Sequence, residues 1–303
     1  MPGNRNGRCC RFACWRPLAR CCLLLVVFAL PVAVFAQLVP SGQTVPFKLH
    51  DGYLMIVQTT VNGAGPFSFL VDTGTTRTVI DPALAGQLQA PVVGEVALTG
   101  ALHQRQDKLV LLKELRLGEA SVSGPGAVVD KIERLTLLAP GIRGVLGEDF
   151  LSRFDILIDY KHRSLCFGGA PPVGERYRFE TIGQYRGDPT TNRLLIAVEI
   201  AEIGPKKMQL DTGARVLELF LPSETSRSTL PWTSLMANGS SANSPAISSN
   251  TTIRIGTTTV RGLDVLQSRR VLAFDAAGLL PAAIFDRIYI SHSGGFVVLN
   301  PPE

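Results

Sequence analysis

The sequence predicts an all-β fold of two lobes, each a small closed barrel. Short runs rich in Val, Ile, Leu, Thr and Phe are punctuated at close intervals by Gly and Pro, which is the pattern of strands and turns. Long segments with a helical apolar period are nearly absent. The tripeptide Asp-Thr-Gly occurs in each half after an apolar run, which indicates two halves related by a pseudo-twofold axis.

In the first half, the apolar runs predict six strands and two short helices. The strands are Val45–Leu49, Leu54–Val61, Ser68–Val71, Leu109–Leu117, Ala127–Asp130 and Ile156–Tyr160, and the helices are Pro82–Leu88 and Glu148–Arg153. Asn62-Gly63 predicts the turn between two of these strands.

Gly and Pro dominate the chain around residues 168–174, and we expect a linker over residues 169–185 between lobes at 37–168 and 186–303. Beyond it the predicted strands are Leu194–Ile203, Lys207–Leu210, Val216–Leu221, Thr251–Ile255, Leu263–Leu266, Arg287–Ile290 and Phe296–Leu299. The stretch Asn238–Asn250 is rich in Ser and Asn and predicts an exposed loop.

Residues 1–36 have the features of a signal peptide. Five arginines and no acidic residue precede an apolar run from Cys21 to Phe35, and Val34-Phe35-Ala36 fits a signal peptidase site. We expect cleavage after Ala36 and export to the periplasm or the medium. The alternative is an uncleaved leader that anchors the protein, since Pro31 interrupts the run and the charged region is long.

The charge and the cysteines exclude several function classes. The five leader arginines account for the net charge of +5, so the remaining 25 basic residues balance 25 acidic ones. Without a basic stripe, a nucleic-acid partner is not expected. Cys166 is the one cysteine outside the leader, so no internal disulfide is expected, and we predict that it is a small core residue.

The repeated Asp-Thr-Gly predicts a site built from two carboxylates, Asp72 and Asp211. An Asx-type turn explains either copy alone but explains two matching copies poorly. Two carboxylates held close share one proton, so one serves as a base towards water and the other as an acid towards a carbonyl.

The neighbouring residues suit this site. Gly74 and Gly213 let the two backbones approach closely, and the hydroxyls of Thr73 and Thr212 are placed to lock the two loops together. This chemistry requires neither a metal nor a cofactor. The four histidines lie far apart in sequence, and neither a paired CxxC nor a carboxylate-rich loop is present, so we expect no metal site.

With these motifs the chain resembles the aspartic peptidase superfamily, pepsin-like and retroviral-type, and most closely bacterial exported proteins with two retropepsin-like lobes. The resemblance runs from about Val45 to the C-terminus. It implies an endopeptidase that acts on a peptide or protein. The element that closes each lobe is matched by Val145-Leu146-Gly147 in the first half, whereas Pro281 replaces the glycine in the second.

The resemblance further implies that Thr75 supports its carboxylate through a hydroxyl, which Ala214 lacks, so the two carboxylates should be inequivalent. It also implies a hairpin flap over Glu95–Val110, with Gly100, Leu102 and His103 near its tip and in reach of substrate.

Two alternatives to a single-chain peptidase remain. Ala214, Pro281 and the Ser-rich second flap raise the possibility of a non-catalytic envelope or peptide-binding module with a degenerate fold. In the other alternative, two first lobes pair across chains and the second lobe is regulatory. Because both halves carry the motif, we expect a monomer.

Overall fold

The computed structural model describes residues 42–99, 104–180, 193–220, 232–233, 243–244, 246–268 and 276–303. The leader and the flap-tip residues Gly100, Leu102 and His103 lie outside these ranges. No helix within the described ranges is long and apolar enough to cross a membrane.

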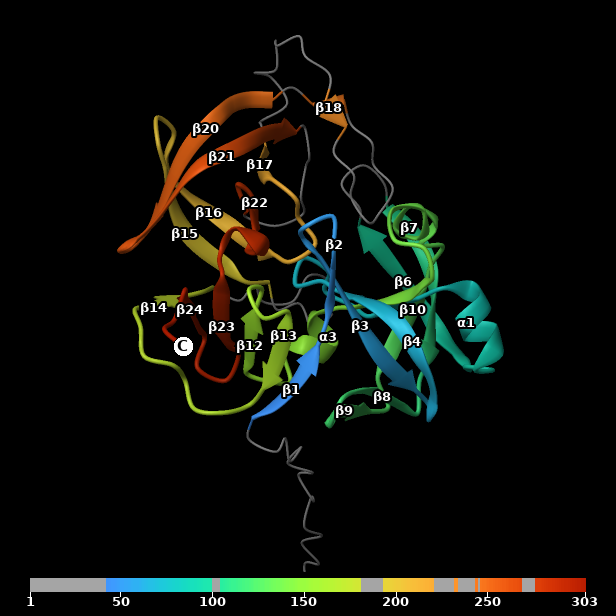
Figure 1. The fold of residues 1–303 in the computed structure, drawn as a ribbon. Coiled ribbons are helices and arrows are strands. Elements are labelled where there is room, and N and C mark those ends of the chain that lie inside the picture. Colours follow the sequence, from blue (N-terminus) through green and yellow to red (C-terminus); the bar gives the residue numbers. More distant parts are fainter. Residues whose placement is uncertain are drawn as a thin grey trace, which may run out of the picture. The chain divides into compact units, whose positions relative to one another are not determined.

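The first lobe is built on a curled sheet with the order β6-β7-β10-β5-β11-β4-β3-β8-β9, to which β2 adds by pairing with β3 (Figure 1). The strands are β2 (Lys48–His50), β3 (Leu54–Val61), β4 (Ala64–Val71), β5 (Val79–Ile80), β6 (Val92–Thr99), β7 (Gln104–Leu111), β8 (Glu114–Leu117), β9 (Ala120–Ser123), β10 (Gly126–Val129) and β11 (Ile142–Leu146). Three short helices accompany them: α1 (Pro82–Gln87), α2 (Glu133–Leu138) and α3 (Glu148–Leu151).

The second lobe is a closed barrel with the order β15-β16-β22-β17-β21-β20. Its strands are β15 (Leu195–Ile200), β16 (Gly204–Asp211), β17 (Leu217–Phe220), β20 (Ala246–Ile255), β21 (Thr258–Ser268) and β22 (Gly278–Pro281). The 3-10 helix η1 (Ala282–Ile284) follows β22, and β18 (Trp232–Thr233) pairs with β19 (Asn243–Ser244).

A third sheet joins the two halves of the chain in the order β1-β13-β12-β23-β24-β14. Its strands are β1 (Gln43–Pro46), β12 (Ile156–Asp159), β13 (Ser164–Phe167), β14 (Arg176–Arg178), β23 (Arg287–Ser291) and β24 (Phe296–Leu299). The junction is the antiparallel pair β12–β23, in which Ile156 faces Ile290. The C-terminal strands therefore complete a sheet that the first half begins.

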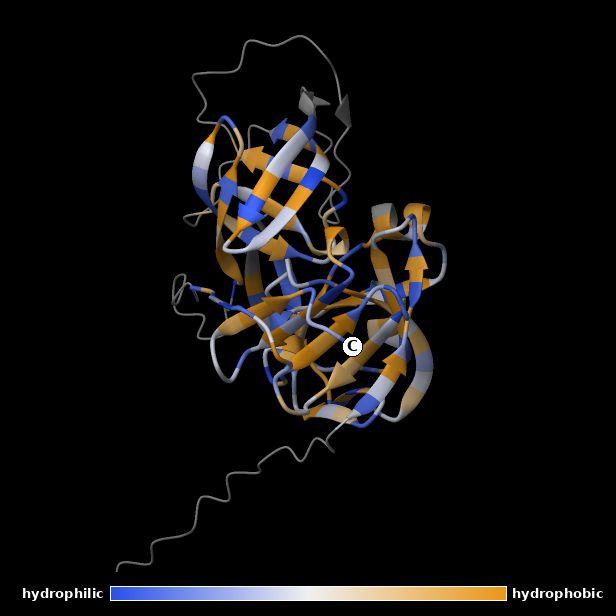
Figure 2. Ribbon diagram, turned by 60° about the vertical axis from the view of Figure 1, so that its left-hand side comes forward, coloured by the Kyte–Doolittle hydropathy of each residue, from blue (hydrophilic) through white to orange (hydrophobic). Residues whose placement is uncertain are grey.

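The core follows from the alternation of apolar and polar residues along the strands (Figure 2). In β15, for example, Leu195, Ile196, Val198 and Ile200 are buried while the intervening Ala197 and Glu199 are exposed. One apolar cluster contains residues from both halves of the chain, and a second, smaller cluster lies between α2 and the first-lobe sheet. Burial of these faces is the main force that holds the sheets together.

The prediction of an all-β, two-lobed fold is confirmed, with a difference between the lobes: the second closes into a barrel, whereas the first is a curled sheet. Two of the predicted strands each merge two strands of the structure. The predicted strand Val45–Leu49 divides into β1 and β2 at Phe47, and Leu109–Leu117 divides into β7 and β8. At the second break the Asn62 side chain accepts hydrogen bonds from the backbone N–H groups of Lys113 and Glu114.

Two further features differ from the expectations, and a third adds detail to the expected linker. The Ser-rich stretch was predicted to be a loop up to Asn250, but β20 begins at Ala246 and pairs with β21. The expected linker contains β14, which pairs with β24 at the edge of the joining sheet. Cys166 is only partly buried, because the alternation along β13 directs Leu165 and Phe167 into the core instead.

Candidate active site

Both Asp-Thr-Gly loops are held by the same local arrangement. In the first lobe β4 runs parallel to β11, with Val71 opposite Leu146, and the Asp72 N–H donates to the Leu146 carbonyl at 3.0 Å. In the second lobe β16 runs parallel to β22, with Asp211 opposite Pro281. Each aspartate thus leaves its strand at the corresponding point of its lobe.

The two threonines lock the loops to each other in a reciprocal pattern. The Thr73 N–H donates to Thr212 Oγ1 at 3.0 Å, and the Thr212 N–H donates to Thr73 Oγ1 at 3.1 Å. Each hydroxyl in turn donates across the lobes: Thr73 Oγ1 to the Leu210 carbonyl and Thr212 Oγ1 to the Val71 carbonyl, both at 2.9 Å. Both side chains are almost fully buried, so water does not compete for these hydrogen bonds.

The two glycines permit the close approach of the carboxylates. A Cβ atom on Gly74 would overlap with the carboxylate of Asp211, and one on Gly213 would lie 3.1 Å from the carboxylate of Asp72. Each glycine therefore makes room for the aspartate of the other lobe. This is a steric requirement for a small residue, since neither glycine has a positive φ.

The two carboxyl groups are buried and inequivalent, and each contributes to the pKa shift of the other. Asp72 accepts from the Gly74 N–H at 2.8 Å and from Thr75 Oγ1 at 2.7 Å. Asp211 accepts from the Gly213 N–H at 2.7 Å, while Ala214 offers no hydroxyl. The additional donor stabilises the anion at Asp72.

The electrostatics follow the same asymmetry. Burial raises the pKa of Asp72, and the hydrogen bonds from Thr75 and Gly74 oppose this rise. Burial and then the negative charge of Asp72 raise the pKa of Asp211 well above its usual range. When the pair shares a single proton, these directions favour the proton on Asp211 and the negative charge on Asp72.

The lobe-closing element differs between the two halves, and the predicted flap of the first half is described in its strands. A Cβ on Gly147 would overlap with the backbone of Arg77, so the first lobe requires glycine there, whereas Pro281 occupies the equivalent position at the end of β22. The predicted flap is a hairpin of β6 and β7, in which Val96 faces Asp107. Its tip lies outside the described residues.

A buried ion pair that sequence reasoning missed lies beside the first loop. His292 Nε2 is 3.1 Å from Glu148 Oε2, and its Nδ1 is 2.6 Å from the Phe154 carbonyl oxygen. Burial raises the pKa of Glu148, and the Glu148 carboxylate raises the pKa of His292 against the opposing effect of burial. This pair connects α3 to the turn between β23 and β24.

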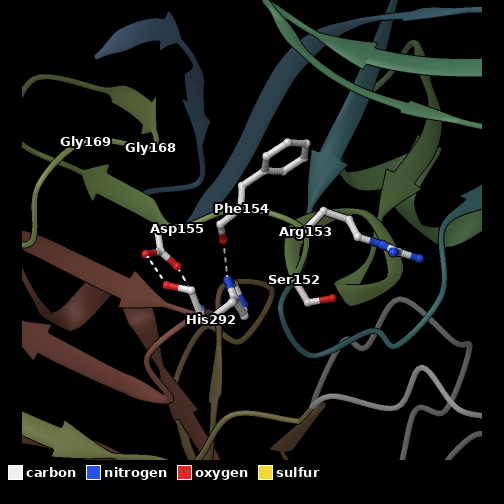
Figure 3. A pocket seen from close by; sticks show the side chains of 8 residues that line it. Ser152, Arg153, Phe154, Asp155, Gly168, Gly169 and His292 are labelled. Carbon is white, nitrogen blue, oxygen red and sulfur yellow. Dashed lines mark hydrogen bonds between the residues drawn. The ribbon is translucent and has the colours of Figure 1, made fainter. Parts of the chain in front are cut away.

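A pocket of about 280 Å³ lies at the same junction (Figure 3). Its lining includes Arg153, Asp155 and His292 but neither carboxylate of the central pair. The Asp155 carboxylate accepts from the N–H and the hydroxyl of Ser293 at 2.9 and 2.7 Å, and these hydrogen bonds help to lower its pKa. We interpret this cluster as a structural connection between the halves.

A second missed feature reaches the first loop from the second lobe. Gln209 Nε2 donates to the Gly74 carbonyl at 3.1 Å, and Arg193 Nη1 donates to Gln209 Oε1 at 3.1 Å and to the same Gly74 carbonyl at 3.4 Å. Gln209 is fully buried and Arg193 is partly buried. A repeat search does not find them, because the equivalent residues of the first lobe are apolar.

Within the described part of the chain, no group of three or more His, Cys, Asp or Glu side chains is placed to bind a metal ion. The site that stands out is instead a pair of buried carboxyls on two interlocked Asp-Thr-Gly loops, which defines the aspartic-peptidase class of folds.

Comparison with known proteins agrees with this class. Residues 57–150, from β3 through most of α3, match the family model described as aspartyl protease. The match contains Asp72 and its loop and supports an aspartic-peptidase-type family. No curated protein matches the chain.

Proposed function

We propose that the protein is an aspartic-type endopeptidase in which Asp72 and Asp211 of one chain activate a water molecule for attack on a peptide bond. The observation that carries the proposal is the reciprocal lock of Thr73 and Thr212, which brings both carboxyls into one buried pair. The aspartyl protease match of residues 57–150 supports the same class of reaction.

The inequivalence of the pair assigns the roles. Asp72, which accepts two supporting hydrogen bonds, serves as the base that deprotonates the water. Asp211 holds the shared proton and donates it towards the carbonyl oxygen as the tetrahedral intermediate forms. The intermediate then collapses as a proton passes to the leaving amine. No covalent intermediate with the protein is needed.

We further propose an extended peptide as substrate, with the β6–β7 hairpin as the flap and Gly100, Leu102 and His103 near its tip. An extended peptide pairs with strands through its backbone, and its alternate side chains enter pockets. We also propose that the protein acts as an exported monomer. This rests on the signal-peptide pattern of residues 1–36 and on the presence of both loops in one chain.

The test is cleavage of a peptide library by the full chain from acidic to neutral pH, with Asp72→Asn as the matched variant. We expect cleavage that a peptide carrying a hydroxyl in place of the scissile carbonyl inhibits. We also expect a loss of at least about 100-fold in Asp72→Asn, because general acid–base catalysis contributes that much or more. Peptide binding without cleavage, in folded wild-type protein, would favour the alternative of a non-catalytic binding module.

A further inference from the structure

The strand registers show that polar residues in the second lobe replace an apolar cluster of the first. Gln209 faces Leu279 of β22 as Leu70 faces Val145 of β11, so Gln209 and Leu70 occupy equivalent positions. Leu70 belongs to the smaller apolar cluster of the first lobe. Gln209 is equally buried, yet it carries an amide.

The same registers extend the equivalence to two more positions. Leu195 faces Gln209 as Ile56 faces Leu70, so Arg193, two residues before Leu195, corresponds to Leu54. Glu218 faces Leu279 as Val79 faces Val145, so Glu218 corresponds to Val79. Leu54 and Val79 are buried apolar residues, and Glu218 is buried as well.

Buried polar side chains are costly unless they form hydrogen bonds, so their presence at three equivalent positions calls for a reason. For Gln209 and Arg193, hydrogen bonds supply one. Gln209 and Arg193 both donate to the Gly74 carbonyl, and Gln209 also reaches the Thr73 carbonyl at 3.4 Å. The second lobe therefore holds the backbone that follows Asp72. Leucine at the first-lobe positions has no group that could hold the opposite loop in this way.

Arg193 also brings a positive charge to the pair. The Gly74 backbone that it contacts lies directly against the Asp211 carboxylate. Burial lowers the pKa of Arg193 to about 10, while the charges of Asp211 and Asp72 act to raise it, so the guanidinium remains charged at neutral pH.

Other ionisable groups also act on the pair. The charge of Glu218 on β17 raises the pKa of Asp211, and the charge of Asp72 contributes to the raised pKa of Glu148 on α3. His292 offsets the charge of Glu148 through their ion pair. Tyr160, which follows β12, interacts with Asp211 and has a pKa raised by burial, so it stays neutral. Arg193 therefore contributes a positive charge beside the pair, and its hydrogen bond to the Gly74 carbonyl holds that charge in place.

We propose that Arg193 is a positioning residue, held by Gln209, that fixes the first-lobe loop from the second lobe and sets the pH range of the reaction by its permanent charge. This inference rests on the proposed function. A positive charge beside the pair favours its ionised forms, so the reaction proceeds at lower pH than the same pair would allow without it.

The test compares neutral and charged replacements in the full chain. We expect Arg193→Met and Arg193→Gln to move both limbs of the pH profile of kcat/KM upward by about one pH unit. This is the shift expected when a positive charge that is separated from the carboxyl pair by the Gly74 backbone is removed. Arg193→Lys keeps the charge and should leave both limbs in place. Gln209→Leu, which copies the first-lobe residue, removes the hydrogen bonds to the Gly74 and Thr73 carbonyls and the one that holds Arg193. It should lower kcat/KM about 10-fold and move the limbs less than Arg193→Gln does, since the Arg193 charge is retained.

The proposal would be overturned if the profile of Arg193→Gln, like that of Arg193→Lys, superimposed on the wild type. Unmoved limbs would mean that Arg193 has a merely structural role. Circular dichroism checks that each variant folds. If Arg193→Met does not fold, Arg193→Gln still tests the charge, because its amide keeps hydrogen-bond donors. Titration of ¹³C-labelled Asp carboxyls, assigned with Asp72→Asn and Asp211→Asn, gives a readout independent of turnover. A raised carboxyl pKa in a wild-type-like fold without cleavage would support the role of Arg193 and contradict the peptidase function; an unmoved pKa would overturn the role itself.

Discussion

The reciprocal threonine lock makes the strongest prediction about stability. Thr212→Val keeps the shape of the side chain but removes the hydrogen bond from the Thr73 N–H and the one to the Val71 carbonyl. Both partners are buried and would lose their hydrogen bonds. At about 1–3 kcal/mol for each of the two buried groups left unsatisfied, we expect the free energy of unfolding to fall by about 2–6 kcal/mol.

Urea unfolding monitored by circular dichroism measures this loss. With a slope of about 2–3 kcal/mol per M, the midpoint should fall by about 1–2 M while the slope stays unchanged. Thr73→Val removes the two symmetry-related hydrogen bonds and should have a similar effect.

The matched control is Thr59→Val. Thr59 is also fully buried, but its hydroxyl has no hydrogen-bond partner within the described residues. Removal of a buried unsatisfied hydroxyl should leave the free energy of unfolding unchanged or raise it by about 1 kcal/mol. If Thr212→Val and Thr59→Val unfold at the same urea concentration, the lock does not stabilise the protein and our reasoning is wrong.

Two further predictions concern close packing and pH. Gly74→Ala should reduce peptide cleavage by at least about 100-fold, because its Cβ overlaps with the Asp211 carboxylate. The control Gly86→Ala in α1 should be tolerated, since nothing lies within 4 Å of its added Cβ. Equal activity of the two variants would contradict the steric argument. The second concerns the Glu148–His292 pair, whose members both have raised pKa values in the folded state, so the folded protein holds more protons than the unfolded one. Its stability therefore falls with rising pH, from the ordinary Glu value of 4.5 upward through Glu148 and from the ordinary His value of 6.5 upward through His292. The measurement is the urea midpoint at pH 6 and at pH 8.5, which lie on either side of the ordinary His pKa. The two midpoints should differ less in the double variant Glu148→Gln/His292→Gln than in the wild type. An equal difference in both proteins would show that the pair is not the source of the pH dependence of stability.

The sequence alone predicts those parts of the protein that depend on local pattern or on repetition. Alternation of apolar residues predicts strands such as β3, whose bounds agree with the prediction. The two Asp-Thr-Gly copies predict that Thr73 and Thr212 lock together, because a repeat implies a symmetry axis and residues on that axis meet.

Features that break the repeat could not be predicted in the same way. Glu148 and His292 are separated by 144 positions and have no counterpart in a motif, so only the three-dimensional pairing of β12 with β23 brings them together. Arg193 and Gln209 correspond to leucines in the other lobe, and their roles emerge only from the strand registers. The bounds of β20 also escaped prediction, because pairing with β21 overrides the low strand propensity of its Ser-rich start.

The most direct test of the central claim, that one chain supplies both carboxyls of one site, is peptide cleavage by Asp72→Asn and Asp211→Asn, each alone and mixed in equal amounts, with native mass measured on the same samples. We predict a monomer whose activity either substitution abolishes and which mixing does not restore. Activity that survives in Asp211→Asn, together with a dimeric mass, would contradict the claim and show that two first lobes pair across chains.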